Sequence, residues 1–72
     1  MLANIYAKPG KLTALQKRIA ELGAGIIAMP VRRSIGGFRL ECECTEEQAD
    51  EIEAMAETDL LGRDHRNEKE QA

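Results

Sequence analysis

The chain has 72 residues, of which 43% are apolar, and a formal net charge of −3. This length predicts one small domain, and with Tyr6 and Phe38 as its only aromatic residues its core must consist of small aliphatic side chains. No apolar run approaches the roughly 20 residues of a membrane-spanning helix, and no signal-peptide pattern is present, so we expect a cytoplasmic protein with no membrane partner.

The first two elements follow from the spacing of apolar residues. Residues 2–7 predict a short strand, which ends at Lys8-Pro9-Gly10 because proline supplies no ladder donor and glycine opens a turn. Residues 11–22 predict a helix with a single apolar stripe, and Gly23 is placed to cap its C-terminus. The stripe consists of Leu12, Leu15, Ile19 and Leu22.

The middle of the chain predicts a hairpin. Residues 26–33 form a second strand, and because Pro30 has no N–H this strand belongs at a sheet edge. Ser34-Ile35-Gly36-Gly37 turns the chain into a third strand over residues 38–44, in which apolar and charged side chains alternate strictly. One face of that strand packs on the core, and the other is open to water or a partner. The open face carries Asn4 and Tyr6 of the first strand and Arg39, Glu41 and Glu43 of the third.

A second helix and a short strand complete the domain. Thr45-Glu46-Glu47-Gln48 is a capping box that opens a helix, which we expect to run to Glu57 and to bury Ala49, Ile52, Met55 and Ala56. Leu60-Leu61-Gly62-Arg63 is the candidate fourth strand and has the weakest pattern. We expect a domain over residues 1–64 and a polar, flexible tail over residues 65–72.

This order of elements, β-α-β-β-α-β, predicts an α+β, ferredoxin-like split βαβ fold with two helices on one face of an antiparallel sheet. Right-handed crossovers give the strand order 4-1-3-2. The second strand then lies at an edge, where Pro30 is tolerated.

The charge is divided unevenly along the chain. Residues 1–40 carry seven basic side chains and one acidic one, whereas residues 41–72 carry three basic and twelve acidic ones. Most of the acid falls on the second helix and the tail. This pattern is typical of a solvated helix face, and it also fits a docking surface for a basic partner.

No motif for catalysis, a cofactor or a metal is present. Cys42 and Cys44 lie roughly 6–7 Å apart along one strand face, too far for an unstrained disulfide, so we expect reduced core thiols, with metal or redox chemistry as the alternative. The acids of the second helix lack a pocket for acid–base chemistry. An open face with one tyrosine and two acids is a poor stacking platform for nucleic acid. We therefore expect a non-enzymatic binding protein.

The chain resembles the inhibitor I9 family, the propeptide-like domains of subtilisin-type serine proteases. The likeness covers residues 2 to about 65, with each motif in order and at a suitable spacing. The motifs are Ile5-Tyr6-Ala7-Lys8-Pro9-Gly10, Leu22-Gly23, Gly37-Phe38, Thr45-Glu46-Glu47-Gln48, Leu60-Leu61 and Asp64. Three features depart from the family: Gly62-Arg63 in the fourth strand, the Cys-x-Cys ending of the third, and the charged tail.

The resemblance implies a free-standing inhibitor or chaperone whose open sheet face packs on the protease. On that basis Tyr6, Arg39, Glu41 and Glu43 would meet the protease surface. Asp64 would match the acid near the end of the fourth strand. The segment that begins with His65, Arg66 and Asn67 would enter the active-site cleft.

A second hypothesis is a small acidic interaction protein, of the phage or accessory type, that binds and blocks a different macromolecule or forms a homodimer through its sheet. Its binding surface would include Glu47 and Glu51 of the second helix.

Overall fold

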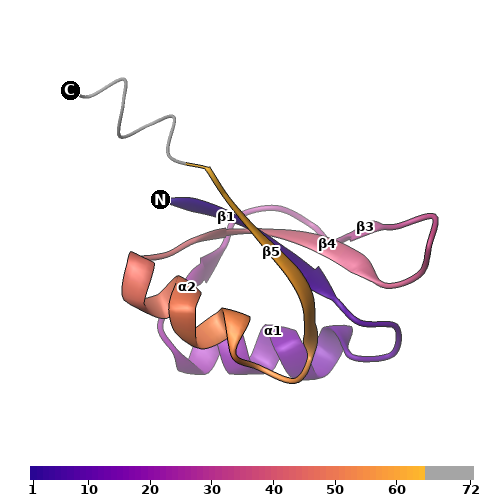
Figure 1. Cartoon of the computed structure of the whole chain (residues 1–72), viewed down its shortest axis with the longest axis horizontal. Helices are drawn as coiled ribbons and strands as arrows, with labels where there is room; N and C mark the ends of the chain where they lie inside the picture. Colours follow the sequence, from indigo (N-terminus) through magenta and orange to yellow (C-terminus); the bar gives the residue numbers. More distant parts are fainter. Residues whose placement is uncertain (65–72) are drawn as a thin grey trace.

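The computed structural model describes residues 1–64 and shows two layers, a sheet of five strands and two helices that cover one face of it (Figure 1). The two helices are α1 (Leu12–Glu21) and α2 (Glu46–Glu53). The strands are β1 (Leu2–Ala7), β2 (Gly25–Ile26), β3 (Val31–Arg32), β4 (Phe38–Glu43) and β5 (Thr58–Asp64). The predicted α+β class and the ferredoxin-like arrangement are confirmed.

The sheet is antiparallel and has the order β2-β4-β1-β5, with β3 also paired to β4. With β2 and β3 taken together as the predicted second strand, this is the predicted order 4-1-3-2. Strand β1 lies in the middle, where Ile5 pairs with Leu40 on one side and with Leu61 on the other. The fourth strand forms over seven residues rather than the four that its pattern indicated.

The second strand is not continuous, contrary to the prediction for residues 26–33. The N–H of Ile27 still donates to the carbonyl of Glu41 at 3.0 Å, but the chain then leaves the ladder until Val31. Pro30 explains the break, because it has no N–H to donate to the ladder. The interruption leaves two strands of two residues each at this edge.

The second helix ends at Glu53 rather than at Glu57, and Ala56, which we expected to be buried, is exposed. Its start is as predicted, because Thr45 and Gln48 form the complete capping box. At its end the chain turns to bring Thr58 into β5. The Thr58 hydroxyl donates to the carbonyl of Met55 at 2.7 Å and lies 3.2 Å from the carbonyl of Ile52. These contacts give a partner to carbonyl groups that the end of the helix leaves without one.

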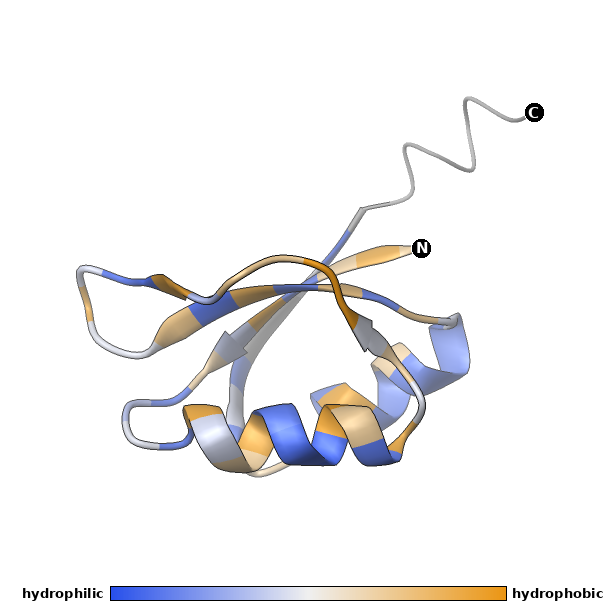
Figure 2. Cartoon of the chain, turned by 180° about the vertical axis from the view of Figure 1, so that it is seen from behind, coloured by the Kyte–Doolittle hydropathy of each residue, from blue (hydrophilic) through white to orange (hydrophobic). Residues whose placement is uncertain are grey.

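The core lies between the sheet and the helices, as the alternation of β1 and β4 predicted. Its fully buried large side chains are Ile5, Leu15, Ile19, Leu40, Ile52 and Cys42. Figure 2 shows apolar and polar positions alternating along both helices, and an apolar segment after β2 at the edge of the sheet. Within residues 1–64, no helix is long and apolar enough to span a membrane.

Candidate partner-binding face

The open face of the sheet brings together three of the predicted site residues, Tyr6, Arg39 and Glu41. Tyr6 pairs with Arg39 across β1 and β4, and Asn4 pairs with Glu41. Because strand side chains alternate, these residues lie on the side opposite to their buried neighbours and away from the helices. The structure therefore confirms that they share one surface.

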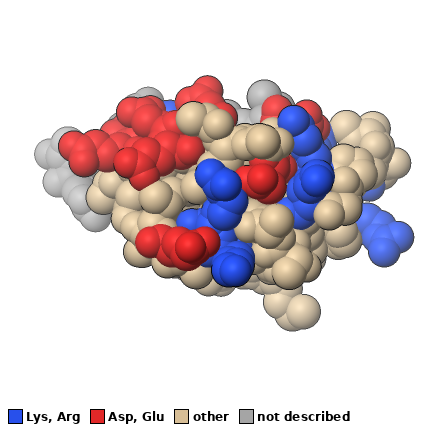
Figure 3. All heavy atoms as spheres, turned by 90° about the horizontal axis from the view of Figure 1, so that it is seen from below, with Lys and Arg blue, Asp and Glu red and all other residues tan. Residues whose placement is uncertain are grey.

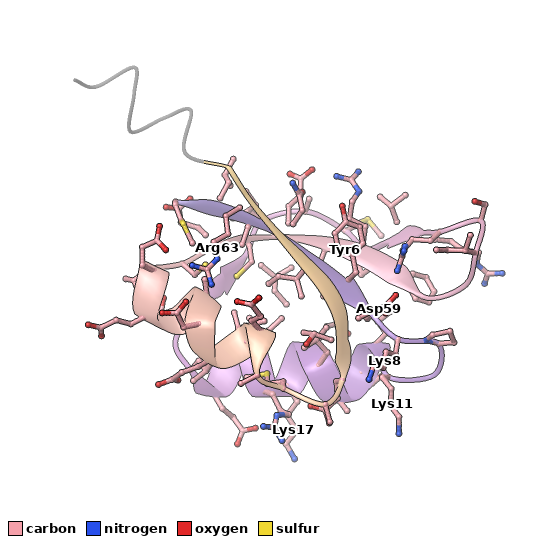
Figure 4. The ribbon with its side chains drawn as sticks, in the orientation of Figure 1. Tyr6, Lys8, Lys11, Lys17, Asp59 and Arg63 are labelled. Atoms are coloured by element: carbon pink, nitrogen blue, oxygen red, sulfur yellow. The ribbon has the colours of Figure 1, made fainter. Side chains whose placement is uncertain are left out.

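Ion pairs order the charged groups on this face. Arg39 Nη1 lies 3.2 Å from Glu41 Oε1 and 3.5 Å from Asn4 Oδ1. The guanidinium of Arg33 lies over the ring of Tyr6, 4.7 Å from its centroid, and its Nη1 is 3.0 Å from Asp59 Oδ2. Each arginine thus has an acidic partner, and the face carries no large net charge. Figure 4 shows Tyr6 and Asp59 near the same end of β5.

Sequence reasoning missed Arg33 and Asp59 as members of this face. In the sequence, Arg33 is the last residue of the predicted second strand, and Asp59 lies between the predicted second helix and the fourth strand. Asp59 reaches the face because β5 has an irregularity at this point, where its register with β1 shifts between Tyr6 and Ala7. A shift of register within a strand leaves no mark in the sequence.

The exposed aliphatic side chains were also missed. Ile27, Met29, Val31 and Ile35 are 54%, 86%, 50% and 78% exposed. Val31 pairs with Arg39, and the N–H of Ile27 bonds to Glu41, so both lie beside the charged residues of the open face. Their only sequence signal is the apolar character of the segment around Pro30. A continuous strand would have turned about half of the side chains of this segment toward the core.

The other predicted residues lie farther from Tyr6. Glu43 shares the side of Arg39 and Glu41 by strand alternation, but it is at the end of β4, where its Oε1 lies 3.1 Å from the amino group of Met1. Glu47 and Glu51 are exposed on α2, on the helix-covered side of the sheet. Figure 3, seen from the helix side, shows acidic side chains gathered at one end and basic ones across the middle and the other end. The structure therefore separates the predicted set into two surfaces on opposite sides of the sheet.

The C-terminal part of the predicted site begins at the end of β5. Asp64 ends β5, where it pairs with Leu2. His65, Arg66 and Asn67 lie outside the described residues, so the predicted cleft-binding segment stays a prediction.

Arg63, which interrupts the apolar pattern of the fourth strand, has a structural role. It pairs with the buried residue Ala3 and so belongs to the helix side of the sheet. Its two terminal nitrogens lie 2.7 Å from Glu46, 2.7 Å from Asp50 and 3.0 Å from Glu53. These acids are spaced along one side of α2, and the arginine ties the helix to β5. Arg63 therefore fits the strand rather than breaking it.

Cys42 and Cys44 are both buried on the helix side of β4. Burial raises the pKa of Cys42 to about 12, with a further contribution from the charge of Cys44, and burial also raises the pKa of Cys44. The thiolate is the nucleophile and the metal ligand, so both side chains are unreactive thiols at neutral pH. Among the described residues, no cluster of three or more His, Cys, Asp or Glu is arranged to hold a metal ion.

The raised pKa of Cys42 predicts a loss of stability at alkaline pH. Because the folded state holds this thiol protonated, its contribution is complete below the ordinary value of 9.0 and is lost as the pH rises toward about 12. We expect the free energy of unfolding, measured in urea, to fall over this interval. The variant Cys42→Ala should be less stable at neutral pH but should show a shallower fall. An equally steep fall in this variant would contradict the assignment to Cys42.

Comparisons with protein-family models, curated proteins and solved structures gave no match for this chain. The assignment of the candidate site therefore depends on the geometry of the open face and on the resemblance noted in the sequence.

Proposed function

We propose that this chain is a non-enzymatic protein-binding domain that docks through the open face of its sheet, and that its partner is a subtilisin-type serine protease. The observation that supports this proposal most directly is the composition of the face. No helix within residues 1–64 covers it, and it presents exposed Ile27 and Val31 beside the ordered pair of Tyr6 and Arg33.

This composition is typical of a protein–protein interface. Aromatic residues and arginine are enriched in interfaces, and contiguous exposed apolar surface marks interaction sites. Tyr6 and Arg33 are also held in place, by their mutual stacking and by Asp59, so little side-chain entropy is lost when a partner binds.

The face, rather than the neighbouring edge, is the more favourable docking surface. Addition of a partner strand needs a row of free backbone donors and acceptors. At the β2 and β3 edge the strands have two residues each, and Pro30 between them has no N–H. Short edge strands and proline are the devices by which natural sheets prevent edge pairing.

The choice of a protease as partner is supported by the resemblance to the inhibitor I9 family. In that family the open sheet face packs on the protease surface and the C-terminal segment occupies the cleft. By position, Tyr6, Arg39 and Glu41 would make the surface contact here, and His65, Arg66 and Asn67 would approach the cleft.

The test is inhibition of a subtilisin-type protease that cleaves a chromogenic peptide. We expect the full chain to inhibit, and truncation after Asp64 to abolish inhibition while leaving binding through the face. Val31→Asp should weaken both inhibition and binding by at least tenfold, because it places a charged group where an apolar side chain contacts the partner. Lys17→Ala, on α1 and away from the face, is the control and should behave as the unmodified chain.

Absence of inhibition and of binding by the folded full chain would exclude the protease. The other partner that the exposed aliphatic residues favour is a second copy of the chain. Sedimentation measured for the full chain and for Val31→Asp would distinguish it, because a dimer formed through the face would dissociate in the variant.

A further inference from the structure

A hollow of about 340 Å³ lies between two turns at one end of the sheet. One turn, Pro9-Gly10, follows β1, and the other joins β3 to β4. Pro9 and Phe38 supply apolar walls, and Arg32, Arg33 and Ser34 supply polar groups. Its volume is within the range of pockets that bind small molecules.

The two turns are held firmly against each other. Gly36 and Gly37 both have positive φ, at 99° and 79°, which favours glycine strongly. A Cβ on Gly36 would lie 3.2 Å from Pro9 Cγ, and a Cβ on Gly37 would overlap the carbonyl oxygen of Ala7. Within the turn that joins β3 to β4, the N–H of Arg33 donates to the carbonyl of Gly37 at 3.1 Å. The walls of the hollow are therefore formed in advance by close packing of backbone.

The hollow carries positive charge in a protein that is acidic overall. Arg32 lies 5.8 Å from the ring centroid of Phe38, and no carboxylate described in the structure pairs with it. The same is true of Lys8 and Lys11, which flank the Pro9-Gly10 turn and lie at that end of the molecule in Figure 4.

Arg33 adds hydrogen-bond donors without adding net charge. The carboxylate of Asp59 balances the charge of Arg33 and accepts a hydrogen bond from one of its terminal nitrogens. Within residues 1–64, no other hydrogen bond engages the guanidinium of Arg33. Because its side chain is only 18% exposed and lies over Tyr6, the donors of Arg33 are fixed in position.

We propose that this hollow binds the phosphate group of a small organic phosphate. Planar guanidinium groups match phosphate oxygens with paired hydrogen bonds, and the hydroxyl of Ser34 offers a further donor. Arg32 lines the hollow without an acidic partner among the described residues, and Lys8 and Lys11 flank the adjoining turn, so the local charge favours a dianion over a monoanionic carboxylate. Pro9 and Phe38 leave apolar surface for the organic part of the ligand. This site shares Arg33 with the partner-binding face, but phosphate binding there does not depend on the proposed function.

The test is an NMR titration of the full chain with phenyl phosphate, at an ionic strength held constant with sodium chloride. We expect saturable shifts of the backbone amides at residues 10, 11 and 32–38. Arg32→Ala should weaken the affinity at least tenfold. Lys17→Ala removes the same charge from α1, away from the hollow, and should change the affinity less than twofold. The amide spectrum of each variant reports whether it is folded.

Three results would overturn the proposal. The first is the absence of saturable shifts. The second is an equal loss of affinity in Arg32→Ala and Lys17→Ala, which would show general charge attraction. The third is equal affinity for benzoate, which would show that the site does not select phosphate.

Discussion

Replacement of Ile5 by alanine is expected to remove a large part of the free energy of unfolding of this domain. Ile5 is fully buried in β1, the central strand, between Leu40 and Leu61 in register. Truncation of such a side chain costs about 2–5 kcal/mol, because transfer free energy is lost and a cavity remains. A domain of 72 residues has a total stability of only about 4–11 kcal/mol at the usual 0.05–0.15 kcal/mol per residue. Urea unfolding followed by circular dichroism measures the loss.

Ile27→Ala is the matched control for that variant. It removes the same atoms from a side chain that is 54% exposed, on the open face beside Glu41. We expect a change within about 0.5 kcal/mol, as for surface positions in general. A comparable loss in both variants would mean that the open face is covered in solution, as in a dimer, or that Ile5 does not lie in the core.

Gly37→Ala is expected to have the second large effect. The φ of Gly37 is 79°, and a Cβ there would overlap the carbonyl oxygen of Ala7, which is backbone and cannot rotate away. The left-handed conformation costs a residue with a Cβ about 1–2 kcal/mol. The steric overlap adds about 1–3 kcal/mol, as for other overpacked sites. We expect a lower melting temperature and loss of the hollow between the two turns.

Gly10→Ala separates these two contributions. Gly10 has nearly the same φ, 77°, but an added Cβ would meet nothing within 4 Å. Its cost should therefore be the conformational part alone, about 1–2 kcal/mol. Thermal unfolding of both variants measures the difference. Equal losses in the two would show that the turn at Gly37 moves away from Ala7 without cost.

The sequence predicted the elements whose signals are local. The alternation in residues 38–44 predicted which side chains of β4 are buried, and the capping box at Thr45 predicted where α2 begins. It also predicted the sheet order, because few connections satisfy the crossover rule and place Pro30 at an edge. Tyr6, Arg39 and Glu41 were correctly placed on one face, since strand periodicity alone decides this.

The sequence did not predict features that depend on contacts between distant segments. The end of α2 depends on how Thr58 enters β5, and the role of Arg63 depends on three acids that only the packing of α2 brings near it. The stacking of Arg33 on Tyr6 brings the residue after β3 against β1, and these two segments are far apart in the sequence.

The amino-acid sequence by itself therefore determined the fold class, the strand order and which side chains of β1 and β4 face away from the core, because periodicity and capping act within a few residues. Only the tertiary structure decided that Glu47 and Glu51 lie away from that face, that Ile27 and Val31 remain exposed on it, and that two turns enclose a basic hollow. The physical reason is that register, strand breaks and the approach of two turns are set by packing across the whole domain, which local patterns do not encode.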